Sequence, residues 1–326
     1  MPGVLDIITG KDIIEADIGG LPCAYPVVNR DGTPMVYPVH PVIPAERVLH
    51  VGDPVAAVIA ESLDQAQAAA AKIVVKYEVL ASHTDLASAL QPRAARVRPE
   101  LANNQCFDWG LGDESAVNKA LAKAQHIVEL DLVQNRINAS PMETGGAVGL
   151  FDSGRDEYTL YTSTQNPHAI RVCLSACTLK IPEEKIRVIS PDVGGGFGMK
   201  IYHYAEEVLV LLAAKRLKRP VRWIASRSEA FLADTYARDY VTKVTLGFDD
   251  DGKFIALKVH TIANLGAYLS TFGPAIPTFL RKSVPRPLFC PRYLHSRARG
   301  IHQHNASRRL SWRWTAGNDL CDGAHC

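Results

Sequence analysis

Apolar and polar positions alternate over several stretches of the chain, and this period of two predicts β-strands. The expected strands lie at 50–62, 74–80, 125–139, 147–152, 157–163, 185–190 and 220–226, with a hairpin over 240–263 that turns at Asp251 and Gly252. Alanine-rich or helically periodic segments predict helices at 62–75, 115–124, 166–179, 204–218 and 227–234. Ser62 and the pair Asn166 and Pro167 mark two helix starts. This mixture of elements predicts an α+β fold.

The composition is that of a globular protein with room for two domains, since 47% of the 326 residues are hydrophobic and 21% are charged. The formal net charge of +2 gives no overall case for binding nucleic acid or an anionic membrane. No apolar run is long enough to span a membrane, and the N-terminal segment lacks the order of a signal peptide. Seven cysteines without pairing spacings favour a reducing compartment, so we expect a cytoplasmic protein.

One stretch departs from both periodicities. In IRVISPDVGGGFGMK, residues 186–200, a strand ends and four glycines surround Phe197 before the next helix begins. The four are Gly194, Gly195, Gly196 and Gly198. A single glycine would indicate no more than a tight turn. So many glycines, each with an entropic cost, favour a loop whose backbone N–H groups closely approach an anionic or oxo-bearing ligand.

Two familiar nucleotide-binding motifs fail at this loop. A phosphate-binding P-loop ends in Gly-Lys-Ser/Thr, but here Met199 precedes Lys200 and Ile201 follows it. A dinucleotide fingerprint that starts at Gly194 requires a glycine at the position of Met199. The loop therefore matches neither motif.

Other reactive residues have simpler explanations. Cys173 and Cys177 lie four apart on an expected helix, and we expect them to be buried packing residues. The acidic run at 249–251 is expected to form a turn, because no EF-hand spacing follows it. The segment HYAEE at 203–207 could mimic a metal site, but we expect it to be the exposed first turn of a helix.

The character of the chain changes after about residue 280. From 281 to 318 there is no Asp or Glu but there are eight arginines, and the hydrophobic periodicity stops. One interpretation is a basic tail that binds nucleic acid, with arginines on phosphates and tryptophans stacked on bases. The other interpretation is a segment that was never selected to fold.

Three motifs together resemble a known family. SPDVGGGFGMK, with YTSTQNPH upstream and VGDPVAAVIAES nearer the start, is similar to the molybdopterin-binding large subunit of the xanthine dehydrogenase, aldehyde oxidase and carbon monoxide dehydrogenase family. The resemblance covers residues 1 to about 280. It implies an N-terminally incomplete a/b hammerhead domain at 1–85, a connector at 86–119 and the first of two molybdopterin-binding domains at 120–280.

The resemblance implies that the glycine loop contacts a molybdenum–molybdopterin cofactor. The backbone amides from Gly196 to Gly198, beside Gly195, would approach the cofactor and its oxo group, and Phe197 would pack beside the metal. Gln165 matches a glutamine whose side chain donates to a molybdenum oxygen. Such donors suit a metal-bound oxygen, which is an acceptor. We expect no protein ligand to the metal in this chain.

The reaction implied by the resemblance is hydroxylation of an aldehyde or N-heterocycle with oxygen taken from water. Electrons would leave through 2Fe–2S clusters on a small subunit and FAD on a medium subunit, because no cysteine spacing here fits a cluster. The intact enzyme would be a dimer of such heterotrimers, with no nucleic acid and no membrane span.

The family's general-base glutamate belongs to the second molybdopterin-binding domain, so we expect no catalytic residue in this chain. Glu143 is not that base, and Thr144 follows it where the family usually has proline. Ile201 stands where the xanthine-oxidising branch has a glutamate, which argues against a purine substrate.

The family also suggests another origin for the ending. One branch has an active-site loop that reads D-A-Y-R-G-A-G-R-P, and RRLSWRWTAG at 308–317 permits this string when the reading frame moves forward by one nucleotide. That loop lacks the cysteine of the copper-bearing, CO-oxidising branch, so CO oxidation is not expected. We expect residues 281–326 to be an out-of-frame, disordered tail, and the chain to be a truncated, poorly soluble fragment without activity. The alternative is a non-catalytic protein that binds an anion or nucleotide through the glycine loop.

Overall fold

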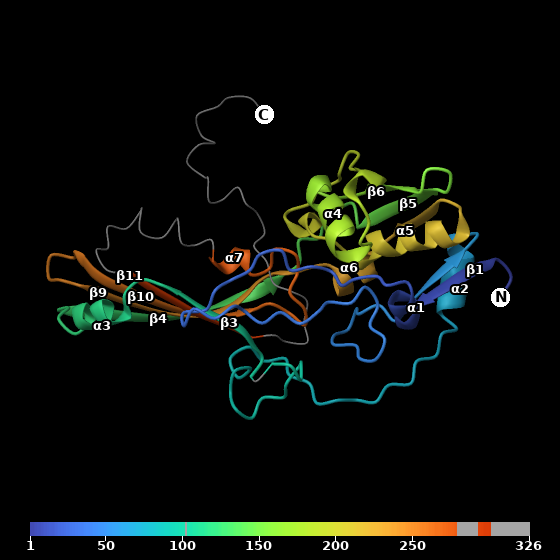
Figure 1. Cartoon of the computed structure of the whole chain (residues 1–326). Coiled ribbons are helices and arrows are strands. Elements are labelled where there is room, and N and C mark those ends of the chain that lie inside the picture. The colour runs from blue at the N-terminus through green and yellow to red at the C-terminus, as the bar shows by residue number, and fades with distance from the viewer. Residues whose placement is uncertain (102, 279–292, 301–326) are drawn as a thin grey trace. The chain divides into compact units, whose positions relative to one another are not determined.

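The computed structural model describes residues 1–101, 103–278 and 293–300 (Figure 1). These residues form two compact units, each built from three separate stretches of chain. The first unit contains Met1–Cys23, Val39–Ala81 and Ala139–Asp234, and the second contains Ala24–Pro38, Ser82–Asn138 and the described residues after Asp234. Neither unit therefore coincides with one continuous segment.

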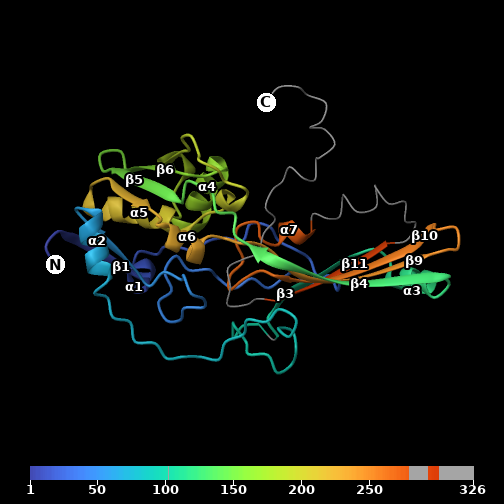
Figure 2. The ribbon, with the colours of Figure 1, turned by 180° about the vertical axis from the view of Figure 1, so that it is seen from behind.

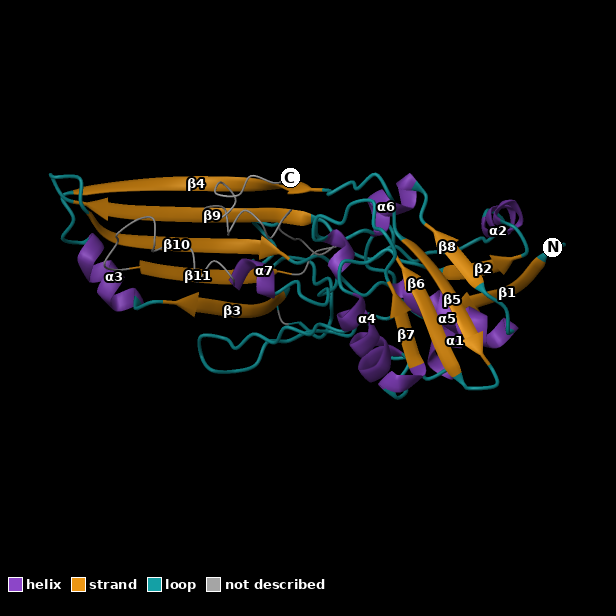
Figure 3. Ribbon diagram, turned by 90° about the horizontal axis from the view of Figure 1, so that it is seen from above, coloured by secondary structure: helices purple, strands orange, loops and turns teal. Residues whose placement is uncertain are grey.

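A four-stranded sheet organises the first unit, in the order β7–β6–β5–β8 (Figure 3). Its strands are β5 (Gly146–Asp152), β6 (Glu157–Thr162), β7 (Ile186–Ile189) and β8 (Val221–Ile224). Strand β5 is antiparallel to β6 and β8, whereas β6 is parallel to β7. Because parallel strands end at the same edge of a sheet, the segments that follow β6 and β7 meet there. Those two segments hold Gln165 and the glycine loop.

Helix α4 (Pro167–Cys173) connects the parallel pair. It begins at the expected signal, with Asn166 as N-cap and Pro167 in the first turn, and it continues into a π-helical turn at Leu174–Thr178. A smaller antiparallel sheet pairs β1 (Val4–Thr9) with β2 (Ala56–Ala60). Helix α1 (Gly10–Glu15) follows β1, and α2 (Leu63–Ala70) follows β2 with Ser62 as the expected N-cap.

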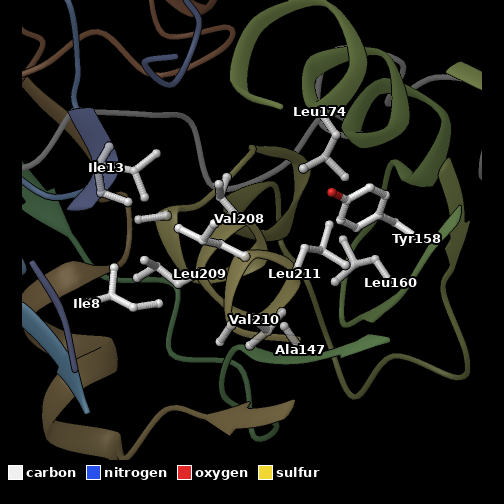
Figure 4. Packing of buried hydrophobic residues seen from close by; sticks show 14 of the residues in the cluster. Ile8, Ile13, Ala147, Tyr158, Leu160, Leu174, Val208, Leu209, Val210 and Leu211 are labelled. Atoms are coloured by element: carbon white, nitrogen blue, oxygen red, sulfur yellow. The ribbon is translucent and has the colours of Figure 1, made fainter. Parts of the chain in front are cut away.

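Helix α5 (Ala205–Leu217) is the centre of the hydrophobic core (Figure 4). Its residues 208–214 are all buried, and Figure 4 shows Leu160 and Leu174 on one side of it and Ile8 and Ile13 on the other. Each such aliphatic side chain contributes about 1.5–3 kcal/mol by leaving water. The helix expected at 204–218 is confirmed, and its middle is buried because the four-stranded sheet and β1 both contact it.

The contact between α5 and β5 leaves no room for a side chain at Gly149. A Cβ atom there would lie 2.5 Å from the carbonyl oxygen of Val210. Gly149 lies in strand β5 and Val210 in helix α5, so neither residue can move without displacing a whole element. Gly149 therefore sets the distance between the helix and the sheet.

The second unit is a five-stranded sheet in the order β3–β11–β10–β9–β4 (Figure 3). Its strands are β3 (Gln105–Leu111), β4 (His126–Ile137), β9 (Ala237–Phe248), β10 (Phe254–Asn264) and β11 (Tyr293–Gly300). Strands β9 and β10 form the expected hairpin, and β11 runs parallel to β10. Helix α3 (Glu114–Leu121) packs on the sheet near the β9–β10 turn (Figures 1 and 2), and α7 (Ala275–Thr278) follows β10 in the chain.

A polar cluster joins three strands of this sheet. Arg136 on β4 donates through Nε to Asp239 on β9 over 3.0 Å, and the amide of Asn264 on β10 donates to the same carboxylate over 2.8 Å. Arg238 and Asp239 both have positive φ angles, 70° and 67°. The cluster therefore holds a strained bend in β9 against its two neighbours.

Most of the expected elements are confirmed, but the strand expected at 74–80 is wrong. That segment forms no helix or strand, and Val74 and Val79 are 83% and 92% exposed. β-Branched residues favour a strand only where a neighbour supplies hydrogen bonds and burial, and no described strand pairs with this one. The elements β1, α1, β3, α7 and β11 were not expected.

The ending is described only in part. Of the segment 281–326 that was expected to be disordered, residues 293–300 form β11 and the others lie outside the described residues. Over the described ranges, no helix is both long enough and apolar enough to cross a membrane.

We expect Gly149→Ala to lower the free energy of unfolding by more than about 3 kcal/mol, because two backbones would have to separate. Gly146→Ala is the matched control on the same strand, since its Cβ would meet nothing closer than 3.8 Å. We expect that variant to change stability by less than about 1 kcal/mol. Denaturant unfolding followed by circular dichroism measures both, and equal midpoints would contradict the packing described here.

Candidate functional site

The glycine loop, residues 194–198, follows β7 and precedes a 3₁₀ turn at Met199–Ile201 that leads to α5. The backbone is left-handed at Gly195 (φ 96°), Phe197 (φ 49°) and Gly198 (φ 84°). Glycine adopts this conformation freely, whereas Phe197 does so at a cost of about 1–3 kcal/mol. Its ring is 52% exposed, so burial does not offset the cost. A strained and exposed aromatic residue is typical of a ligand site.

Gln165 fits closely against this loop. Its side-chain oxygen accepts a hydrogen bond from the N–H of Gly198 over 2.9 Å. A Cβ atom on Gly196 would lie only 2.4 Å from the side-chain carbonyl of Gln165. The structure thus brings together Gln165 and the loop residues that the sequence singled out, Gly195, Gly196, Phe197 and Gly198.

Several donors of this site are not used within the described structure. The N–H groups of Gly196 and Phe197 donate to no acceptor among the described residues, and neither does the side-chain NH₂ of Gln165. In contrast, Gly194 donates to Glu143, and Gly195 donates to the carbonyl of Val193. Consecutive N–H groups in a turn of this kind form a concave surface that binds an acceptor.

A buried lysine lies behind the loop. The side chain of Lys200 is only 1% exposed, and its Nζ donates to Glu143 and to the hydroxyl of Ser163, each over 2.7 Å. The same Glu143 oxygen accepts from Ser163 and from the N–H of Gly194, again over 2.7 Å each. Sequence reasoning missed Lys200 and Ser163, and it named Glu143 only to exclude it as the base. The one available signal was a charged residue shortly after the glycine loop.

Glu143 is ionised under ordinary conditions. Burial opposes its ionisation, but hydrogen bonds from Lys200, Ser163 and the N–H of Gly194 outweigh that effect and lower its pKa. The stabilisation from these contacts is present above the ordinary carboxyl pKa and is lost as the pH falls through the lowered value. The network is therefore intact at neutral pH.

A pocket in the first unit shares Lys200 with this network. Its walls come from the ends of the sheet strands, the start of α5 and helix α6 (Arg227–Ala233). Polar and aromatic residues of the lining are Thr162, Ser163, Lys200, Tyr202, Tyr204, Glu206, Glu207, Trp223, Glu229 and Asp234. Burial raises the pKa of Glu206 to about 7, and neighbouring carboxylates add to the shift. Burial also raises the pKa of Asp234 to about 6, although Lys200 and Arg227 oppose this.

The segment 203–207 is not an exposed helical turn, so that expectation is wrong. His203 and Glu207 are each only 4% exposed, and a hydrogen bond of 2.7 Å joins Nδ1 of His203 to Oε2 of Glu207. Glu207 also accepts from the hydroxyl of Thr162 over 2.8 Å and from the N–H of Tyr204 over 3.1 Å. The pair therefore ties the start of α5 to the end of β6.

The two neighbouring cysteines differ in burial. Cys173 is buried, as expected of a packing residue, whereas Cys177 is partly exposed. Burial raises the pKa of Cys173 to about 12, with smaller effects of Cys177 and Glu207, so the thiol is unreactive at neutral pH. Across the described part of the chain, no cluster of three His, Cys, Asp or Glu side chains is placed to hold a metal ion.

We expect Glu206→Gln to reduce the loss of stability that occurs at alkaline pH. Glu206 is neutral in the folded protein up to a pKa of about 7, so folding takes up a proton between 4.5 and that value. The stabilisation is complete below 4.5 and is lost as the pH rises through about 7. Relative to the unmutated chain, the variant should gain about 1–3 kcal/mol between about pH 5 and about pH 8. Unfolding at each pH measures this gain.

Exposed Glu184 provides the control for this experiment. For Glu184→Gln, the difference in free energy of unfolding from the unmutated chain should be the same at both pH values. A pH-independent difference for Glu206→Gln would show that its carboxyl is not held neutral.

Comparison with known proteins gives two family matches. Residues 97–309 match the family described as "Molybdopterin cofactor-binding domain". Residues 1–81 match the family described as "Aldehyde oxidase and xanthine dehydrogenase, a/b hammerhead domain". The expected domains were 120–280 and 1–85, so the first of these matches begins earlier and extends past residue 280. Together the two matches cover all of the first unit and most of the second, with residues 82–96 between them.

Individual relatives agree with these matches. The carbon monoxide dehydrogenase large chain of Hydrogenophaga pseudoflava is 31% identical over 96% of this chain and 39% of its own length. The nicotine 6-hydroxylase large subunit of Paenarthrobacter nicotinovorans is 33% identical over 82% of this chain and 32% of its own length.

A solved structure gives the same answer for the fold. Quinoline 2-oxidoreductase from Pseudomonas putida 86 superposes with a TM-score of 0.83 at 32% identity, over 95% of this chain and 38% of that one. The chain thus spans about two fifths of the length of its first relative. It belongs to the molybdopterin-binding large subunits of the molybdenum-dependent xanthine dehydrogenase, aldehyde oxidase and carbon monoxide dehydrogenase family.

Proposed function

We propose that this chain provides one wall of a molybdenum-cofactor site, and that Gln165 and the glycine loop hold the cofactor. The observation that carries the proposal is the set of unused donors, namely the N–H groups of Gly196 and Phe197 and the side-chain NH₂ of Gln165. They lie next to one another, because Gln165 fits against Gly196. An acceptor placed among them would receive several hydrogen bonds at once.

The residues present fit the chemistry of that cofactor. Its oxo group and the oxygen atoms of its pterin and phosphate are acceptors, and the site offers neutral donors. The missing Cβ of Gly196 allows a ligand and Gln165 to approach the same stretch of backbone. Gly198, which the resemblance included among the donors, already donates to Gln165. We therefore assign the contacts with the cofactor to Gly196 and Phe197.

The contribution of this chain to the reaction is binding and orientation. When bound, the molybdenum cofactor supplies oxygen transfer and accepts the two electrons that hydroxylation releases. Gln165 and the loop amides fix its position, and the exposed ring of Phe197 shields one side from water. The family's base glutamate is assigned to a second molybdopterin-binding domain, so turnover requires more polypeptide than the residues described here.

The reaction of the whole enzyme is proposed to be hydroxylation of an N-heterocycle or an aldehyde with water-derived oxygen. Two relatives with 33% and 32% identity are named for nicotine and quinoline, which are N-heterocycles. Electrons would pass to a 2Fe–2S small subunit and an FAD-binding medium subunit. Ile201, in place of the glutamate of the xanthine-oxidising branch, disfavours purines.

The test is the molybdenum content of the purified chain after expression in cells that make the cofactor. Gly196→Ala should lower molybdenum and pterin per chain about tenfold, because its Cβ would displace Gln165. Gly154→Ala, in the exposed β5–β6 turn, is the control and should keep the content of the unmutated chain. Metal is measured by mass spectrometry and pterin by fluorescence of its oxidised form.

The alternative is a protein that binds a nucleotide or another anion through the same loop. An unmutated chain without molybdenum that binds ATP or NAD stoichiometrically would replace the proposal. Equal molybdenum in Gly196→Ala and the unmutated chain would show that the metal is held elsewhere.

A further inference from the structure

Lys200 is a buried cation to which the proposed function gives no role. Its side chain is 1% exposed, and a buried ammonium group is tolerated only when it is paired. Its partners are Glu143 and Ser163, at 2.7 Å each. Because Glu143 is ionised and neutralises the charge, Lys200 adds little net attraction for an anionic ligand. Any contribution to the site must then come from geometry.

The side chain of Lys200 holds the start of the glycine loop. One oxygen of Glu143 accepts both the ammonium group and the N–H of Gly194. Glu143 and Gly194 are joined a second time, because the N–H of Glu143 donates to the carbonyl of Gly194 over 3.3 Å. The segment from Gly194 to Lys200 is thereby closed into a ring through Glu143. The unused donors of Gly196 and Phe197 lie within that ring.

The backbone of Lys200 holds the other half of the site. Its carbonyl accepts the N–H of Gln165 over 2.8 Å and the hydroxyl of Thr164 over 2.9 Å. Gln165 in turn accepts from Gly198. A single residue therefore connects the loop, through its side chain, and the glutamine, through its backbone.

We propose that Lys200, through its ion pair with Glu143, is a positioning residue. It fixes the loop amides and the side chain of Gln165 at the relative positions that the cofactor requires. This inference rests on the proposed function for the identity of the ligand, but the ring itself is independent of it. The ion pair acts on the shape of the site, and Ser163 assists by holding both of its members.

Global stability alone does not account for such a pair. Removing one partner of an ion pair is costly when the remaining charge stays buried and unpaired, whereas the pair itself often adds little to stability because desolvation cancels most of the attraction. Methionine resembles the lysine side chain in length and packs well in buried sites. Lys200→Met should therefore keep the core intact while it releases Gly194. Glu143, whose side chain is 41% exposed, can be solvated in that variant.

The first measurement is amide hydrogen exchange at single-residue resolution on the cofactor-free chain. Lys200→Met should speed exchange of the Gly194 and Gly198 amides about tenfold, while the amides of α5 keep their protection. Lys11→Met, an exposed substitution on α1, is the matched control and should match the unmutated chain. Unchanged exchange at Gly194 and Gly198 in Lys200→Met would show that the contact between Lys200 and Glu143 does not restrain the loop.

The second measurement is molybdenum per chain in the same variants, together with thermal melting. Lys200→Met should lose about fivefold or more of the metal, with a melting temperature within about 4 °C of the unmutated chain. Normal metal content with a loosened loop would overturn the positioning role. A large fall in melting temperature with loss of protection throughout α5 would make Lys200 a structural residue and also overturn it.

Two further substitutions keep the test decisive if Lys200→Met does not fold. Ser163→Ala removes one acceptor of the ammonium group, and Glu143→Gln retains an oxygen for Gly194 while it removes the charge. Both substitutions should speed amide exchange at Gly194, but by less than Lys200→Met does. Unchanged exchange in both variants would contradict the proposal. An unmutated chain without molybdenum would reject the proposed function, while the exchange data would still decide whether Lys200 shapes the loop.

Discussion

The close contact of α5 with β5 at Gly149 is the constraint on which the first unit depends. The helix can reach the sheet only because a Cβ is missing there, and its buried face supplies the core. The glycine loop directly precedes this helix, and Gln165 follows a strand of the same sheet. The spacing of helix and sheet therefore also sets the spacing of the two parts of the site, for which an error of about 1 Å matters.

Much of this arrangement could be predicted because its signals are local. Alternation predicted all four strands of the first unit's larger sheet and the strands β4, β9 and β10 of the second unit. The pair Asn166 and Pro167 predicted the start of α4. Gln165 and the loop could be placed together because both follow strands and both match one family's motifs. Strained backbone at a non-glycine residue, as at Phe197, leaves no periodic trace. It was therefore found only in the structure.

The remainder depends on contacts between distant parts of the chain. Lys200 pairs with Glu143, and Arg136 pairs with Asp239. The members of each pair are far apart in the sequence, and the hydrophobic periodicity holds no information on such contacts. The expectation of an exposed 203–207 segment failed because such residues are usually solvated, whereas His203 and Glu207 are hydrogen-bonded to each other in the interior. The strand expected at 74–80 failed for the opposite reason, since its apolar residues have no described partner strand. In each case, tertiary pairing overrides local preference.

The kind of donors at the loop distinguishes between the ligands considered for it. Phosphate groups are most often bound by arginine or lysine, whose charges match theirs. Here the one lysine of the loop segment is buried and paired with Glu143, so the groups offered to a ligand are two backbone amides and a carboxamide. Neutral donors at fixed positions suit an acceptor that must be held at short range in one orientation, such as a metal-bound oxygen. The ion pair that neutralises Lys200 thus favours the cofactor over a nucleotide, and it does so through the same contacts that shape the loop.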